Sequence, residues 1–463
     1  MRHASSSDWR KGASARKTKT HTIRQPNRHN HTSVVQPDSL NALVAAMDPA
    51  NARAKPIRPL GAASASTACS TAAGGTVIDM TELNEIVDIG ENTVTVQAGV
   101  NLKTLVDALA VHGREIPGSL DLVNRTVGGA VASACIGPST AADGAFFARQ
   151  VVSMTVVTPS GRTMTITQQR RELLNVFRMS YGLLGVIFQV TLQTRPLSTF
   201  AVKQKKMPIK AFATALESIA SSPVGLKFYL MPFKGHVYTE LRRHEGTHGN
   251  VRALPWKVKD WGESAVLPAI CNKLARVVPI KSVRYSLVDG LTGLSQSLLN
   301  NRLIADGSNA VDQSAQSSAS NPGMTLKYST WCFPASDANM VIQAYQHFCK
   351  KYYKEHKFRC DMPSVGFKLG VDRSALLSPS FDEPMFALRA ISNPYPQWDD
   401  FAFEYGAFAQ QWGGVPLFNQ SINVEMSYAA LAYGSRLEFF RKVRRQMDPD
   451  NRLLNPFLAQ YFC

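Results

Sequence analysis

Hydrophobic and polar positions follow two periods along the first 195 residues, which predicts short strands and short helices. Residues 94–98 read Val-Thr-Val-Gln-Ala, with an apolar side chain at every second position, as in a strand with one buried face. Residues 102–109 carry leucines at helical spacing. They follow Asn101, a helix-capping residue type, and precede Gly113, which can end a helix. This pattern predicts an α+β fold with frequent turns.

The same reasoning divides the rest of the chain into further elements. In the first part it predicts a strand and a helix within 33–47, a strand at 77–80, a hairpin at 151–169, and a helix, a glycine turn and a strand within 170–196. In the second part it predicts strands at 224–233, 236–243, 324–334 and 384–392 and helices at 337–355 and 398–414. The second part therefore suits a sheet covered by helices.

This pattern divides the chain into four parts. We expect a disordered arm at 1–30, a first domain at 31–195, a second domain at 196–420, and a segment at 421–463 that returns to the first domain. The stretch at 307–323 is of low complexity and predicts a mobile loop.

Charge and cysteine content narrow the function classes. The net charge is +17, but the basic residues are spread along the chain, as on a solvated surface, so nucleic-acid binding is not predicted. No apolar run reaches about 18 residues, which excludes a predicted membrane span, although peripheral membrane contact stays open. The arm lacks the apolar core of a secretory signal. The seven cysteines show no metal-site spacing, which favours reduced thiols, a cytoplasmic location and no metal.

Two loops of the first domain consist almost entirely of small side chains. The first reads Arg-Pro-Leu-Gly-Ala-Ala-Ser-Ala-Ser-Thr at 58–67, and the second lies within 117–144. Backbone N–H groups around glycines can form an anion-binding nest, and short side chains let a phosphate approach the backbone. For either loop alone the alternative is a tight turn packed against a neighbour, whereas both together favour a dinucleotide. The Gly-x-Gly-x-x-Gly motif of nicotinamide-binding proteins is missing from the first hundred residues.

The order of these motifs resembles the FAD-binding domain of the vanillyl-alcohol-oxidase-type flavoproteins. Within that family it resembles the sugar-lactone and alditol oxidase branch, which includes gulonolactone and arabinonolactone oxidases. The likeness rests on the loop at 58–67 and on the stretches at 76–87, 92–109, 116–140, 151–162, 180–192 and 447–462.

The resemblance implies a two-domain flavoprotein. Its FAD-binding domain, of the PCMH type, would consist of two small α/β subdomains, and a substrate or cap domain would follow. The first small-residue loop would hold the pyrophosphate, and the second would lie beside the flavin. The implied cofactor-binding residues are Arg58, Gly61, Ala62, Ala63, Ser64, Ala65, Ser66, Gly118, Ser119, Thr126, Gly128, Gly129, Ser133, Gly137, Val186 and Ile187.

This sequence departs from the family pattern at the position that bonds the flavin and at the positions of the family's catalytic residues. Many relatives bond a loop histidine to the flavin, and Ser64 stands at that place, which implies non-covalent FAD. The branch's Glu-x-Arg pair falls on Gly366 and Lys368, and its lysine near the flavin falls on Gln420. Lysine keeps a charge but lacks the planar fork of arginine. The candidate catalytic residues are Lys368, Gln420 and Asn419; the alternatives are an exposed strand lysine and amides that cap a loop.

The sequence therefore predicts an FAD-dependent oxidoreductase that removes a hydride from a CH–OH group of a small polar substrate. Oxygen or another acceptor would take the electrons. The alternatives are a sugar-1,4-lactone oxidase proper and a flavin-binding protein without turnover of its own. The substrate and the oligomeric state stay open.

Overall fold

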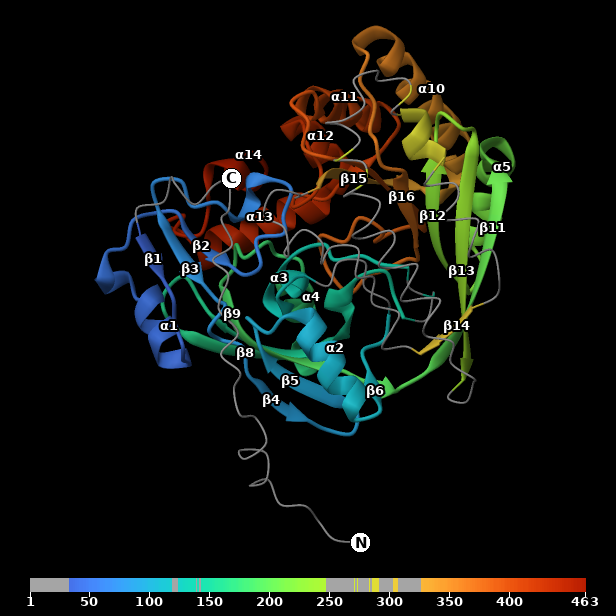
Figure 1. The fold of residues 1–463 in the computed structure, drawn as a ribbon. Helices are drawn as coiled ribbons and strands as arrows, with labels where there is room; N and C mark the ends of the chain where they lie inside the picture. The colour runs from blue at the N-terminus through green and yellow to red at the C-terminus, as the bar shows by residue number, and fades with distance from the viewer. Residues whose placement is uncertain are drawn as a thin grey trace, which may run out of the picture.

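The computed structural model describes residues 33–118, 124–138, 140, 143–246, 270, 273, 283, 285–290, 303–306 and 326–463 (Figure 1). Its helices are α1 (Leu40–Met47), α2 (Leu102–Val111), α3 (Val127–Ala132), α4 (Arg171–Phe177), α5 (Ile209–Ala220), α10 (Ala338–His356), α11 (Trp398–Gln411), α12 (Met426–Tyr433), α13 (Ser435–Met447) and α14 (Pro456–Phe462). The expected arm at 1–30 and the expected loop at 307–323 lie outside the described residues.

Two sheets and their helices form the first part of the chain. One sheet is parallel, in the order β1-β3-β2, and the other is antiparallel, in the order β4-β5-β9-β7-β8. The strands are β1 (Ser33–Val35), β2 (Ile57–Leu60), β3 (Thr76–Asp79), β4 (Ile86–Ile89), β5 (Thr93–Gln97), β7 (Val151–Val157), β8 (Thr163–Thr167) and β9 (Val186–Gln193), and a small pair joins β6 (Arg114–Glu115) to β10 (Arg195–Pro196).

Local sequence signals explain these elements. The side chain of Ser39 accepts a hydrogen bond from the N–H of Ala42 at the start of α1, and Asn101 accepts one from Lys103 at the start of α2. In β5, Val94 and Val96 are fully buried while their neighbours are partly exposed, as the alternation predicts. The predicted α+β fold with small subdomains is confirmed.

The second part of the chain is built on one antiparallel sheet of eight strands. Their order is β14-β11-β13-β12-β16-β17-β15-β18. Their bounds are β11 (Thr199–Pro208), β12 (Gly225–Met231), β13 (His236–Gly246), β14 (Leu303–Asp306), β15 (Lys327–Pro334), β16 (Ser364–Leu369), β17 (Met385–Ser392) and β18 (Val415–Pro416). Helices α5 and α10 pack together against one face, which confirms the predicted sheet covered by helices (Figure 1).

The other face of this sheet meets the first part of the chain through an apolar layer. From the sheet it receives Tyr229, Phe367 and Ala387, and from the first part Ala134 and Phe146, all buried. Apolar burial of this extent fixes the two parts against each other. We call this side of the sheet its inner face.

The C-terminal helices return to the first part of the chain. The N–H of Ile57 donates to the carbonyl of Arg452 at 2.7 Å, and the fully buried Asn455 donates to the carbonyls of Ala68, Cys69 and Thr71. Helix α14 therefore lies beside the loop that follows β2 (Figure 1). No helix among the described residues combines the length and the apolar composition that crossing a bilayer requires.

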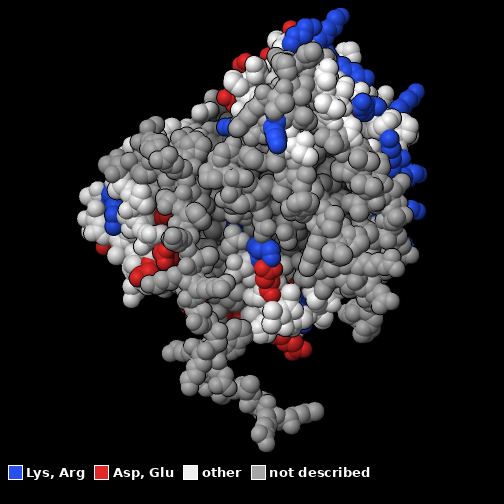
Figure 2. Space-filling model, viewed as in Figure 1, with Lys and Arg blue, Asp and Glu red and all other residues white. Residues whose placement is uncertain are grey.

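Positive charge gathers on the outer side of the second part. Figure 2 shows lysine and arginine side chains over the region that Figure 1 labels β11, α5 and α10. Exposed lysines there are Lys203, Lys205, Lys210, Lys350, Lys351 and Lys354. These side chains point to solvent, which agrees with a charged surface spread over several elements.

Candidate functional site

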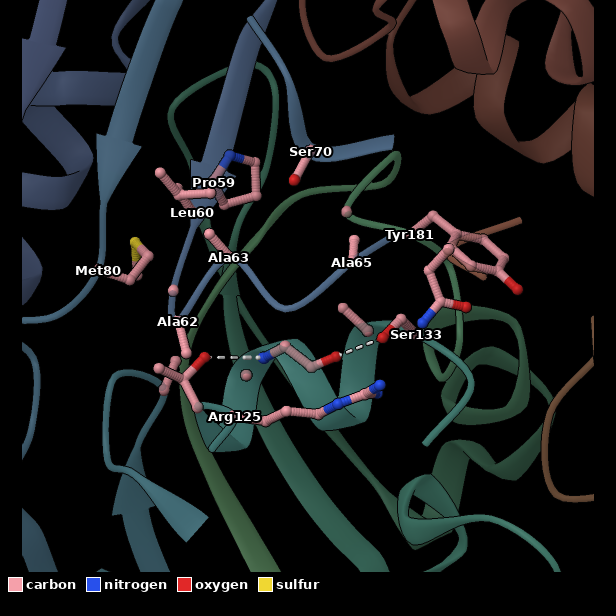
Figure 3. A pocket seen from close by; sticks show the side chains of 18 of the residues that line it. Pro59, Leu60, Ala62, Ala63, Ala65, Ser70, Met80, Arg125, Ser133 and Tyr181 are labelled. Atoms are coloured by element: carbon pink, nitrogen blue, oxygen red, sulfur yellow. Dashed lines mark hydrogen bonds between the residues drawn. The ribbon is translucent and has the colours of Figure 1, made fainter. Parts of the chain in front are cut away.

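A pocket of about 830 Å³ lies in the first part of the chain, between the loop after β2 and helix α3 (Figure 3). Both small-residue loops contribute to its wall, so the structure brings together residues that lie some 65 positions apart in the sequence. Of the predicted cofactor-binding residues, the wall contains Arg58, Gly61, Ala62, Ala63, Ser64, Ala65, Thr126, Gly128, Gly129, Ser133 and Ile187.

The first loop is small partly because protein packs against it. A Cβ atom on Gly61 would lie 2.1 Å from Oγ1 of Thr126, so this position has no room for a side chain. Ala63 adopts a positive φ of 50° and packs near Leu60 and Val77. Packing against a neighbour, the alternative named for either loop alone, therefore accounts for Gly61, because the two loops touch each other there.

The second loop is organised by its own hydrogen bonds. The N–H of Gly129 donates to Oγ1 of Thr126 at 3.3 Å, and Oγ of Ser133 donates to the carbonyl of Gly129 at 2.7 Å (Figure 3). Gly128 lies against strand β5, where an added Cβ would be 2.8 Å from the Cβ of Ala98. This close approach brings α3 against the sheet and leaves its outer side to the pocket.

Two arginines give the wall positive charge. Arg58 is buried and donates to the carbonyls of Tyr181 at 2.5 Å and Leu453 at 2.7 Å. Burial lowers the pKa of Arg58 to about 10, so the guanidinium keeps its charge at neutral pH. Arg125 is 3 % exposed and extends along the pocket below α3 (Figure 3). No carboxylate is among the described lining residues, and such a wall attracts an anion.

One side of the pocket is closed by the segment after β18. Asn419 lines the pocket and is 2 % exposed, and its side-chain N–H groups lie 3.4 Å from the carbonyl of Ala134. Gln420 is fully buried and donates to the same carbonyl at 2.7 Å. Oδ1 of Asn419 has no hydrogen-bond partner among the described residues. A buried acceptor of this kind is costly unless a ligand supplies a donor.

The first loop is also tied to this segment. The N–H of Ser66 donates to the carbonyl of Asn419 at 3.0 Å, and Oγ of Ser66 donates to the carbonyl of Gln420 at 3.1 Å. The hydroxyl of Tyr328, in β15, donates to the carbonyl of Ser64 at 2.6 Å. Ser66 is therefore not in the wall itself and instead joins the loop to the second part of the chain.

Some predicted cofactor residues lie elsewhere. Gly118 and Gly137 line a separate cavity of about 200 Å³ together with Phe146. Val186 is buried next to the wall, and its neighbour Ile187 reaches the wall because successive strand residues face opposite sides. Ser119 lies outside the described residues.

Lys368 is not at the pocket. Residues of β16 alternate between the faces of the sheet, and Phe367 belongs to the inner face while Gly366 and Lys368 face the helices. Nζ of Lys368 donates to the carbonyls of Ser222 and Val224, just after α5, and burial lowers its pKa to about 8. Lys368 is therefore turned away from the pocket, and its catalytic role stays a prediction that this placement does not support. A shift of one residue in the comparison with the family reverses every side chain of a strand.

Sequence reasoning missed several residues of the wall. Met80 is the last residue of the predicted strand at 77–80, Arg125 directly precedes the capping Thr126, and Tyr181 comes from the turn before β9. In the sequence, the one signal for these residues was that they lie next to predicted site residues or predicted elements. Cys69 also lines the wall, and burial raises the pKa of its thiol, which keeps it protonated.

Comparison with known proteins agrees with this geometry. The model of the FAD binding domain matches residues 32–167, and the model of the D-arabinono-1,4-lactone oxidase family matches residues 190–461. The chain is 34 % identical over 167 residues to the mitochondrial L-galactono-1,4-lactone dehydrogenase 1 of Oryza sativa subsp. japonica, a match that covers 35 % of this chain and 28 % of that protein.

An L-gulono-1,4-lactone dehydrogenase of Mycobacterium tuberculosis is 28 % identical over 212 residues, which are 45 % of this chain and 48 % of that protein. The chain thus spans at most about half the length of these relatives. The crystal structure of cholesterol oxidase from B. sterolicum shares the fold, with a TM-score of 0.74 at 14 % identity over 93 % of this chain and 94 % of that chain. Since the second model covers more than half of the sequence, the chain belongs to the D-arabinono-1,4-lactone oxidase family and carries an FAD-binding domain.

Proposed function

We propose that this chain is an FAD-dependent oxidoreductase that acts on a CH–OH group of a small polar substrate, with sugar-1,4-lactones as the first class to test. The observation that carries the proposal is the wall of the pocket. It is lined by small and cationic residues and completed by Asn419, whose buried Oδ1 has no donor within the described part of the chain. A dinucleotide supplies both the negative charge and the donors that such a wall needs.

The pocket suggests which way the cofactor lies. Met80 and Leu60 are at one end, whereas Tyr181 and Ser133 are at the other (Figure 3). The second end adjoins Asn419, from the segment after the last strand of the eight-stranded sheet. We place the adenosine half at the first end and the flavin ring at the second, because a reacting ring must meet a substrate held by the second part of the chain.

The residues of the chain divide into three roles. FAD supplies the two-electron acceptor when it is bound. Arg58 and Arg125 provide positive charge for the pyrophosphate, and the small loop lets that group approach the backbone. Asn419 and Gln420 orient the ring end, since both amides are fixed on the carbonyl of Ala134. The apolar inner face excludes water from that end.

FAD should be held without a covalent bond. Ser64 has no imidazole, and the described wall contains no histidine, while the buried thiol of Cys69 is protonated. Acid precipitation of the yellow protein should therefore release all flavin to the supernatant. Flavin that stays in the denatured pellet and in its tryptic peptides would contradict this prediction.

The substrate class is tested by anaerobic bleaching of the bound flavin. We expect at least one 1,4-lactone of a sugar acid to remove the yellow absorbance within seconds to minutes, with simple alcohols as the control. Relatives named as lactone dehydrogenases support this choice. If dithionite bleaches the flavin and no CH–OH compound does, the chain binds flavin without turning over such substrates, and the proposal fails.

A further inference from the structure

Arg389 is a buried cation on the inner face of the eight-stranded sheet. It belongs to β17, is 4 % exposed and pairs with Val365 of β16. Its guanidinium lies 5.2 Å from the ring centre of Tyr328 and 5.4 Å from that of Phe367. Nε donates to Oγ1 of Thr330 at 3.0 Å. Contacts on several sides therefore fix the plane of the guanidinium.

Arg389 also donates to the residue that closes the pocket. Its Nη2 lies 3.3 Å from Oε1 of Gln420, and Nε2 of the same amide donates to the carbonyl of Ala134 at 2.7 Å. If this amide turned over, its oxygen would face the carbonyl and its N–H groups would face the guanidinium, so both contacts would be repulsive. The arginine thereby determines which end of the Gln420 amide faces the first part of the chain.

A second connection runs from Arg389 to the pyrophosphate loop. The ring of Tyr328, against which the guanidinium lies, carries the hydroxyl that donates to the carbonyl of Ser64. Arg389 therefore contacts two side chains that are hydrogen-bonded to loops of the pocket, Gln420 and Tyr328. Gln420 acts on the carbonyl beside Ser133, and Tyr328 acts on the first loop.

We propose that Arg389 is a positioning residue of the cofactor site, which acts through Gln420 and places a buried positive charge behind the ring end. Reduction of FAD adds negative charge, and a fixed cation in a buried site favours the more negative state. Lys368, the catalytic candidate from the sequence, faces the helices, whereas Arg389 on the neighbouring strand lies on the inner face of the sheet. The proposal rests on FAD binding in this pocket and needs no particular substrate.

The test compares the midpoint potential of bound FAD in Arg389→Met, Arg389→Lys and Arg359→Met, together with the Kd for FAD. Arg359 is a matched control. It is 5 % exposed, lies 4.3 Å and 4.4 Å from the ring centres of Phe233 and Tyr285, and lines a different cavity. Arg359 also forms an ion pair with Asp289 at 2.9 Å, so Arg359→Met should lower the melting temperature at least as much as Arg389→Met does.

We expect Arg389→Met to lower the midpoint potential of bound FAD by about 30 mV, which corresponds to a change of about tenfold in the two-electron equilibrium constant for its reduction. Arg389→Lys should restore part of this loss because it keeps the charge. Arg359→Met should leave the potential unchanged. In a Gln420→Ala background, Arg389→Met should lower the midpoint potential by less than it does in the wild-type protein, since the two residues act together.

Either of two results would overturn the proposal. One is a midpoint potential of Arg389→Met that corresponds to less than a twofold change in that equilibrium constant, or that differs from the wild-type potential by no more than the potential of Arg359→Met does. The other is strict additivity with Gln420→Ala. If Arg389→Met does not fold, Arg389→Lys decides the question. Lysine keeps the charge but lacks the planar guanidinium, so a wild-type potential and a wild-type flavin spectrum of Arg389→Lys would exclude a role for the geometry of the guanidinium. Failure of every lactone to bleach the flavin would leave these measurements intact.

Discussion

Gly61→Ala should weaken FAD binding by about 30-fold or more, a loss of about 2 kcal/mol. The added Cβ would lie 2.1 Å from Oγ1 and 2.8 Å from Cγ2 of Thr126, so the pyrophosphate loop or the start of α3 must move. Thr126 is the N-cap of α3 and is 5 % exposed, which leaves its side chain little freedom. Titration of the apoprotein with FAD, followed by flavin fluorescence, measures the effect.

Two variants show whether this contact is the cause. Gly90→Ala is the matched control, because its Cβ would have ordinary contacts of 3.5 Å or more in a turn between β4 and β5. Adding Thr126→Ala to Gly61→Ala removes the two nearest atoms and should recover part of the affinity. Full flavin occupancy in Gly61→Ala at low FAD concentration would show that the cofactor does not use this loop.

Asn455→Ala should lower the free energy of unfolding by about 3–4 kcal/mol and weaken FAD binding as well. Its Nδ2 lies within 3.2 Å of the carbonyls of Ala68, Cys69 and Thr71, and its Oδ1 accepts from the N–H of Leu458 at the start of α14. The residue is fully buried, so alanine leaves these groups without partners. Denaturant unfolding of the apoprotein measures the loss.

The control separates the helix cap from the tether. Ser39→Ala removes a capping oxygen at α1 and should cost about 1 kcal/mol without affecting FAD. Asn455→Asp keeps an acceptor for Leu458 but turns a carboxylate toward three carbonyls, and we expect it to be at least as unstable as the alanine variant. Equal stability of Asn455→Ala and Ser39→Ala would mean that the tether contributes nothing.

Elements with a clear local period were predictable from the sequence. The alternation at 94–98 and the capped leucine pattern at 102–109 correspond to β5 and α2, because these signals are complete within each segment. Strand β16 was not predicted as an element, and the face that each of its residues takes depends on pairing with β12 and β17. The residues of β16 alone do not indicate this pairing, because its partner strands are distant in the sequence.

The cofactor pocket was predictable to the extent that its residues cluster in two loops. Small residues in both loops indicated a phosphate site, and they line one pocket. Arg125 and Arg389 could not be assigned in this way, because each gains its position from contacts with distant residues. Lys368 illustrates the same limit, since charge and residue type suited a catalytic role while its strand register turns it to the other face.

The return of the C-terminal helices has a consequence for how the chain matures during synthesis. Arg58 and Leu453, which are hydrogen-bonded, are 395 positions apart, and Asn455 and Ala68 are 387 positions apart. A ribosome must therefore release nearly all of the described chain before the turn at 68–71 gains its partners. Contacts this distant in sequence form late. Loading with FAD is thus expected only after the segment around Leu453 and Asn455 has been synthesised, because the loop at 58–71 gains its partners then.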